Sequence, residues 1–367
     1  MARLTSIKKE TSNYKPTCTL SLYKDNPAQC SVFAELAARM KFSLKTALFI
    51  LFSVALLLLA LRNVRFSDLS DQFSRASYGW LFPVSLSIIA TFGLRAARWR
   101  LALQALGYQP SLFHATVAVS AGNMASLIIP GAGELTRCGT LQRTDGVPMA
   151  QGIGSVVAER LVDLLMLLLL LLLTLLLEYQ RLYRAFADLV LIRLQTIPVV
   201  YLIMAGLLGG LALIAVIWWV RRPGPDADPL AKPTLLQRFS EGLTGLKHLP
   251  NTTNYIILSF AIYGVSFLTM YFSGLAASQS LINPLIALSL LTIGSVGGLA
   301  VPTQGGIGTY HVLFALVLGL YGYSTTQSLA MATFIHAIIM GLSLIISGLS
   351  FLLIPFILDH RTVRSNV

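Results

Sequence analysis

Long apolar segments separated by short polar connections fill most of the chain. A helix that crosses a bilayer needs about 20 apolar residues, and segments of about this kind lie at 44–61, 78–94, 112–129, 152–177, 198–220, 254–276, 285–301, 306–322 and 328–357. We predict an all-α polytopic membrane protein with about eight membrane helices plus re-entrant or broken helices. Its transmembrane domain should cover 42–358, between polar cytoplasmic tails at 1–41 and 359–367. The basic segment at Met40 suits the flank of a first span, so translation starting there is a hypothesis, which an intact mass beginning at Met1 would exclude.

Composition agrees with this pattern. The chain is 55% hydrophobic and 11% charged, which sets it apart from a soluble globular domain and leaves no room for a soluble catalytic module. The net charge is +12, but Lys and Arg lie in the connections rather than between aromatic residues on one face, so no nucleic acid partner is expected. Three cysteines and five scattered histidines show no metal-ligand spacing. We expect no metal and no cofactor.

The distribution of Lys and Arg predicts the topology, because cytoplasmic connections carry an excess of both. The tail at 1–41 and the connection at 221–253 are both basic and are placed in the cytoplasm. Five apolar segments lie between them, and two points on one side require an even number of crossings. The segment at 112–129 runs into Pro130 and Gly131, which break a helix. We interpret it as a re-entrant element that enters and leaves on the cytoplasmic side.

The same rule orients the rest of the chain. The uncharged connection at 277–284 falls outside, and the basic C-terminal tail falls in the cytoplasm. The connections at 62–77 and 178–197 must then lie outside, although their arginines weigh against that placement. The predicted location is the plasma membrane, which is the inner membrane in a cell with two membranes. Both termini are predicted to be cytoplasmic.

Two Pro/Gly breaks inside apolar segments share a pattern. At one constant offset, Gly122, Leu127, Ile129, Pro130 and Gly133 align with Gly294, Leu299, Val301, Pro302 and Gly305. The first break is entered from the cytoplasm and the second from outside, so the two have opposite polarity. Inverted halves with broken helices that meet near mid-membrane are typical of transporters. The alternative is that proline and glycine simply kink two helices.

Charged residues lie inside the span at 152–177. Glu159 and Asp163 share one helical face, and Arg160 can pair with Asp163 three residues on. With Glu134 and Arg137 they could form a compact group of both signs. Charges at membrane depth are costly and usually functional. Two interpretations remain open: a polar cavity that binds a charged or zwitterionic head group, and an ion-pair network that ties the re-entrant element to the span.

Two further residues complete the candidate site. Asn123 precedes the first break and joins the candidate substrate-binding residues. His311 follows the second break and is a candidate proton or head-group contact, although a buried interhelical hydrogen bond is the usual role of such a residue. The sequence contains no G-x-x-x-x-G-K-[ST], G-x-S-x-G or H-E-x-x-H pattern. We assign no catalytic residue, and a translocated substrate would move passively, with an ion or through a partner.

Three sequence runs, at 122–139, 156–163 and 302–311, together with Arg-Ala-Ala-Arg-Trp-Arg at 95–100, resemble the lysylphosphatidylglycerol synthase transmembrane family. That family is the flippase-like part of enzymes that aminoacylate phosphatidylglycerol and move it across the bilayer. The resemblance covers the chain from about residue 42 to its end. The sequence holds no soluble aminoacyl-transferase domain, so aminoacylating activity is not expected with it.

The resemblance assigns residues in three groups. Its P-x-x-G-E-x-x-R stretch corresponds to Pro130, Gly133, Glu134 and Arg137. Its E-R-x-x-D stretch corresponds to Glu159, Arg160 and Asp163, and its second break to Pro302, Gly305, Gly306 and Gly308. The chain departs from the family at Gly131 and Ala132, where members often have an arginine, and at His311, where many have glutamate.

The resemblance implies lipid transport. The first interpretation is a flippase or scramblase for a phospholipid or lipid-linked head group, such as an aminoacylated phosphatidylglycerol or an isoprenoid-linked sugar. A second is an intramembrane enzyme that uses Glu134 or Asp163 as acid or base on a lipid-linked substrate. A third is a membrane subunit that docks a separate lipid synthase through 221–253. The sequence indicates neither the lipid nor the oligomeric state.

Overall fold

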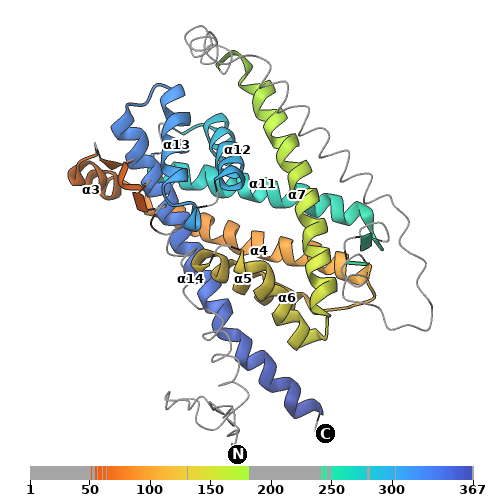
Figure 1. Cartoon of the computed structure of the whole chain (residues 1–367). Coiled ribbons are helices and arrows are strands. Elements are labelled where there is room, and N and C mark those ends of the chain that lie inside the picture. The colour runs from red at the N-terminus through yellow and green to blue at the C-terminus, as the bar shows by residue number, and fades with distance from the viewer. Residues whose placement is uncertain are drawn as a thin grey trace, which may run out of the picture. The chain divides into compact units, whose positions relative to one another are not determined.

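Every regular element that the structure describes is helical (Figure 1). The computed structural model describes residues 64–129, 131–181, 249–278, 282–301 and 303–365, with single residues between 51 and 62 and between 241 and 245, all within the unit Leu48–Val367. The predicted tail at 1–41, the whole segment at 198–220, most of the segments at 44–61, 178–197 and 221–253, and both Pro130 and Pro302 lie outside the described residues.

Four described helices are long and apolar enough to cross a bilayer. They are α4 (Leu81–Gln104, preceded by the 3-10 turn η2, Tyr78–Trp80), α7 (Met149–Leu177), α11 (Thr252–Ala277) and α14 (Thr325–Ser365, apolar as far as Ile354). On α7, Leu165, Leu168, Leu172 and Leu176 are each more than half exposed. A row of exposed leucines along a helix suits a lipid-facing surface. The chain is a multi-pass membrane protein.

The first helical hairpin contains the first break. It joins α5 (Leu112–Ile128) to α6 (Ala132–Asp145) through Gly131, whose φ of 80° few other residues adopt. The helices cross closely, because a Cβ on Gly122 would lie 2.7 Å from the Gly133 carbonyl oxygen. At the open end, His114 Nδ1 and Asp145 Oδ2 are 3.0 Å apart. The two ends of the hairpin therefore lie side by side, which is compatible with a re-entrant element, and its entry and exit on the cytoplasmic side stay a prediction.

A second hairpin contains the second break. It joins α12 (Pro284–Ala300) to α13 (Thr309–Leu320), and the 3-10 turn η4 (Gln304–Gly306) lies between them. Gly305, Gly306 and Gly308 have φ of 57°, 79° and 84°. These left-handed angles explain the cluster of glycines after Pro302. Residues on the two breaks approach each other, because a Cβ on Gly305 would lie 3.7 Å from Leu127 Cδ2.

The two hairpins belong to two similar halves. Each half has a long helix, a hairpin and a second long helix, in the orders α4–α5–α6–α7 and α11–α12–α13–α14. Helices α5 and α12 both have 17 residues, and Leu112 and Pro284 begin them at the offset that also relates Gly122 to Gly294. Helix α4 packs along α11, while α5 packs on α14 and α12 on α7. The internal repeat thus extends to whole elements, and its inversion across the membrane stays a prediction.

The predicted number of membrane helices is not confirmed. Helices α12 and α13 have 17 and 12 residues, so at 1.5 Å per residue they extend only about 26 and 18 Å. The hydrocarbon core is about 30 Å thick. Apolar composition alone made these segments resemble complete spans. The predicted tail at 359–367 is helical as far as Ser365.

Candidate functional site

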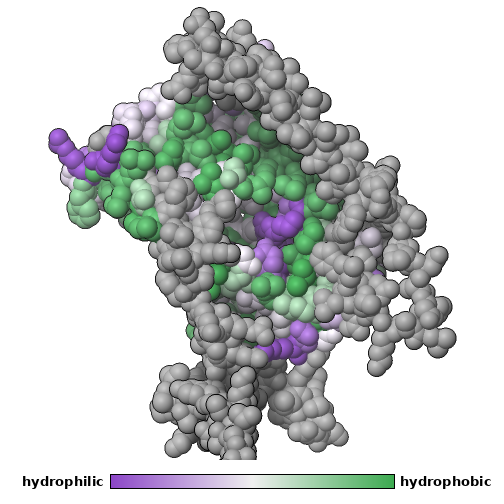
Figure 2. All heavy atoms as spheres, in the orientation of Figure 1, coloured by the Kyte–Doolittle hydropathy of each residue, from purple (hydrophilic) through white to green (hydrophobic). Residues whose placement is uncertain are grey.

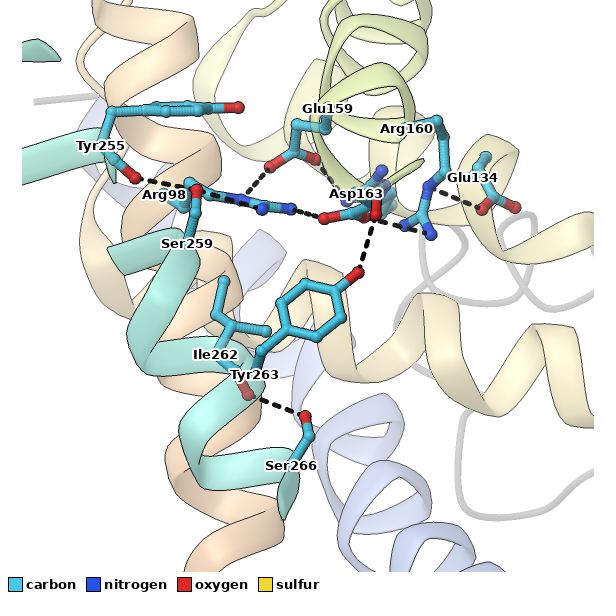
Figure 3. A network of polar contacts seen from close by, with 11 residues as sticks. Arg98, Glu134, Glu159, Arg160, Asp163, Tyr255, Ser259, Ile262, Tyr263 and Ser266 are labelled. Carbon is cyan, nitrogen blue, oxygen red and sulfur yellow. Dashed lines mark hydrogen bonds and ion pairs between the residues drawn. The ribbon is translucent and has the colours of Figure 1, made fainter. Parts of the chain in front are cut away.

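Buried charges gather where α4, α6, α7 and α11 meet (Figure 3). Glu159 and Asp163 lie one turn apart on α7 and both face Arg98 of α4. Arg98 Nη2 is 2.7 Å from Asp163 Oδ1, and Arg98 Nε is 3.5 Å from Glu159 Oε1. Arg98 is 1% exposed and Glu159 2%. The three side chains join α4 to α7 inside the protein, where an isolated charge would be very costly.

Helix α6 contributes Arg137 to the same group. Arg137 Nη1 donates to Glu159 Oε2 at 3.1 Å, so Glu159 is the counter-ion of two arginines. The guanidinium lies over the ring of Trp99, 4.9 Å from its centroid. The indole nitrogen of Trp99 donates to Ser155 Oγ at 3.0 Å, which fixes the ring. Arg137 is therefore positioned by a carboxylate on α7 and an aromatic face on α4.

The outer edge of the network is more exposed. Arg160 is 3.5 Å from Asp163 and 4.0 Å from Glu134, and the side chains of Arg160 and Glu134 are 46% and 39% exposed. Tyr263 of α11 donates its hydroxyl hydrogen to the Asp163 carbonyl oxygen at 2.9 Å (Figure 3). Loose pairs of this kind contribute little to stability. They can also open at low cost.

A cavity of about 470 Å³ lies beside the network. Its charged and amide-bearing lining residues are Arg95, Asn123, Glu134, Arg137 and Arg160, and apolar side chains and hydroxyl groups from α4, α5, α11, α12, α13 and α14 form the rest of the wall. Figure 2 shows hydrophilic atoms in a hollow surrounded by hydrophobic surface. The volume lies in the range of small-molecule sites. It could hold a lipid head group, but not a whole phospholipid.

Two hydrogen-bond donors at this cavity have no acceptor among the described residues. They are Arg137 Nη2 and Asn123 Nδ2, and both atoms are buried. Arg137 as a whole is only 7% exposed. Buried donors are nearly always paired, so an unpaired pair at one cavity indicates a ligand rich in acceptor oxygens.

The predicted site residues come together, with two differences of detail. Glu159 and Asp163 hold the arginines rather than line the cavity. His311 is also absent from the wall: it is buried, accepts from the Gly308 amide at 3.3 Å and stacks on His336 with ring centroids 5.0 Å apart. Its neighbour Tyr310 lines the cavity instead. Any proton or head-group role of His311 stays a prediction.

Sequence reasoning missed Arg95 and Arg98 as site residues. The span was predicted to end at residue 94, before the first of these charges, whereas α4 continues to Gln104. Arginine is tolerated there because carboxylates on α7 compensate it. The signal was the spacing of Arg95 and Arg98, three residues apart and hence on one helical face.

Among the described residues, no group of three or more His, Cys, Asp or Glu side chains could hold a metal ion. The charged group instead consists of arginines and carboxylates that form ion pairs. Both interpretations of the group remain compatible with this geometry, since the ion pairs join α4, α6 and α7 while Arg137 and Arg160 also face the cavity.

Comparison with known proteins gives the family. The model described as the lysylphosphatidylglycerol synthase TM region matches residues 46–347, which include every residue of the network and cavity. The chain belongs to this family. Neither curated proteins nor solved structures gave a match. For this family member, the site must therefore be interpreted from its own geometry.

Proposed function

We propose that this member of the lysylphosphatidylglycerol synthase TM family translocates a phospholipid or lipid-linked head group between the two leaflets, as a flippase or scramblase. The unpaired donors at the cavity, Arg137 Nη2 and Asn123 Nδ2, carry the proposal. A head group crosses the hydrocarbon core only if polar partners replace its water, because unsatisfied polar groups there are costly. The cavity supplies such partners.

The surroundings of the cavity fit a substrate with two parts. Hydrophilic side chains lie in the hollow, and the outer faces of α7 and α14 carry exposed leucines, among them Leu168, Leu176 and Leu349. The head group would occupy the cavity while the acyl chains stay in the bilayer. The Arg160–Glu134 pair, 4.0 Å long and partly exposed, is the place where the wall opens at least cost.

The carboxylates suit a binding site better than acid–base chemistry. Glu134 and Asp163, the two candidates for an acid or base, both pair with Arg160. In both pairs the guanidinium faces the carboxylate oxygens that would have to exchange a proton with a substrate. Docking of a separate lipid synthase would use 221–253, most of which lies outside the described residues. Translocation is therefore the function that the geometry favours.

The test is a leaflet-exchange assay. The protein is placed in liposomes with a fluorescent phospholipid, and an impermeant quencher is added outside. With wild-type protein the inner-leaflet fluorescence should also be lost. Arg160→Ala should slow this loss about tenfold, since charge-assisted hydrogen bonds contribute about 1.5–3 kcal/mol.

The control is Arg75→Ala. Arg75 is 82% exposed, pairs only with Asp71 at 4.0 Å among the described residues, and directly follows α3 (Phe66–Ser74) as its C-terminal cap. Its removal should leave the rate unchanged. Quenching by the wild type that never exceeds that of empty liposomes, for any head group, would refute translocation. Chemical change of the lipid, followed by mass spectrometry, would support the enzyme interpretation instead.

A further inference from the structure

The charges of the network and cavity do not balance. Within the described residues, four arginines and three carboxylates take part: Arg95, Arg98, Arg137, Arg160, Glu134, Glu159 and Asp163. Among these described residues, arginines therefore outnumber carboxylates by one. Glutamate and aspartate elsewhere, such as Asp145 and Glu178, have their own partners, His114 and Arg181.

The excess charge lies on the cavity side. Arg98 sits between Glu159 and Asp163 and is absent from the cavity wall. Arg95 lines the wall and forms no ion pair within the part of the chain that the structure describes. Arg137 donates to Glu159 through Nη1, whereas its Nη2 has no hydrogen-bond partner among the described residues. With respect to the described residues, the cavity thus presents an arginine without an ion pair and a guanidinium nitrogen without a hydrogen bond.

The only carboxylate of the described residues on the wall is Glu134, which already pairs with Arg160. A ligand with its own ammonium group would therefore meet three arginines and no free anion. A phosphate diester offers the opposite: one negative charge and several acceptor oxygens. Guanidinium groups bind phosphate oxygens well because their N–H groups form a planar fork. The Asn123 amide can donate to the same group or to a neighbouring hydroxyl.

We propose that the cavity selects a phospholipid head group with a net negative charge, a phosphate diester esterified to a neutral alcohol, over zwitterionic and cationic head groups. The proposal rests on the proposed function and specifies its substrate. Arg95 supplies the net charge, and Arg137 Nη2 and Asn123 Nδ2 bind phosphate oxygens. A zwitterionic head group is less favoured because its ammonium lies against these arginines.

The test compares head groups in the leaflet-exchange assay. Fluorescent phosphatidylglycerol and phosphatidylcholine are measured in otherwise identical liposomes. Phosphatidylglycerol should move at least tenfold faster, which corresponds to about 1.4 kcal/mol. Added inorganic phosphate should leave this preference unchanged. Its loss in millimolar phosphate would show that the site takes a soluble phosphate and would overturn the assignment to a lipid.

A variant assigns the preference to the cavity. Arg95→Gln removes one positive charge from the cavity wall. Because Arg95 forms no ion pair with the described residues, the variant protein should keep its fold, which is checked by comparing its melting temperature with that of the wild type. The preference should fall below about twofold, through slower movement of phosphatidylglycerol. Arg100→Gln, on the same helix but not in the wall, should keep the wild-type preference.

The two proposals fail differently. If no lipid moves, translocation itself is wrong. If both lipids move equally fast through the wild-type protein, translocation stands and the charge preference is wrong. An unchanged preference in Arg95→Gln would also overturn the proposal, because the selecting charge would then lie elsewhere.

Discussion

At the residue scale, Glu159 holds the network together. It is 2% exposed and is the counter-ion of both Arg98 and Arg137. Glu159→Gln keeps the size of the side chain but leaves Arg98 with Asp163 alone, and it leaves Arg137 without an ion pair to any described residue. Breaking a buried ion pair costs about 3–5 kcal/mol. We expect a loss of stability of that order, measured by thermal unfolding in detergent.

Glu134→Gln is the matched comparison for Glu159→Gln. Its carboxylate is 39% exposed and 4.0 Å from Arg160, so its removal should cost at most about 1 kcal/mol. Equal loss of stability in the two variants would contradict the central role of Glu159.

At the element scale, the α5–α6 crossing depends on two glycines. A Cβ on Gly133 would collide with the carbonyl oxygen of Gly122 and with Ser126 Oγ. Gly133→Ala should therefore separate the helices and destabilise the protein by about 1–3 kcal/mol. Gly139→Ala, on the same helix with no atom within 4 Å of the new Cβ, should be neutral or slightly stabilising. Equal melting temperatures for the two variants would show that the crossing tolerates a methyl group.

Much of the element pattern was predictable, because proline and glycine mark where α5 and α12 end. The predicted segments at 112–129 and 285–301 agree with these helices to within a residue. The predicted end of the span at residue 94 was wrong, because a run of arginines normally ends a membrane span and α4 continues to Gln104. The carboxylates that pair with Arg98 lie about sixty positions later in the sequence. The spacing of Glu159, Arg160 and Asp163 revealed half of the site. The spacing of Arg95 and Arg98 placed them on one helical face, but the packing of this face against α7 is a long-range contact, which no local pattern contains.

At the scale of the whole molecule, hydrogen bonds join two connections that were both predicted to lie outside the cell. The Ser77 amide donates to the Ala276 carbonyl oxygen at 2.9 Å, and Gln72 donates to Ala277 at 2.8 Å. The connections at 62–77 and 277–284, both predicted outside, are therefore neighbours. The arginines in the connection at 62–77 are the main objection to placing it outside. The contacts nevertheless show that this connection lies beside the one at 277–284, which has no charged residue.

Single cysteines can decide the orientation. In a background with Cys18 and Cys30 replaced by serine, the buried Cys138 is the one cysteine left before a new one is added. In this background Ser278→Cys should react with an impermeant thiol reagent only from outside, and Ser365→Cys only from the cytoplasmic side. Labelling is measured in sealed vesicles of known orientation. Reaction of both positions from one side would contradict the predicted topology.

Packing between the halves has a consequence for biosynthesis. Each hairpin packs on the long helices of its own half and is also covered by one of the other half, because α5 packs on α14 and α12 on α7. The first hairpin thus emerges from the ribosome long before the helix that covers it, and it must wait in the membrane. A chain divided between residues 181 and 241 should give two fragments that degrade when made alone and co-purify when made together. Each half would then act as the folding template of the other.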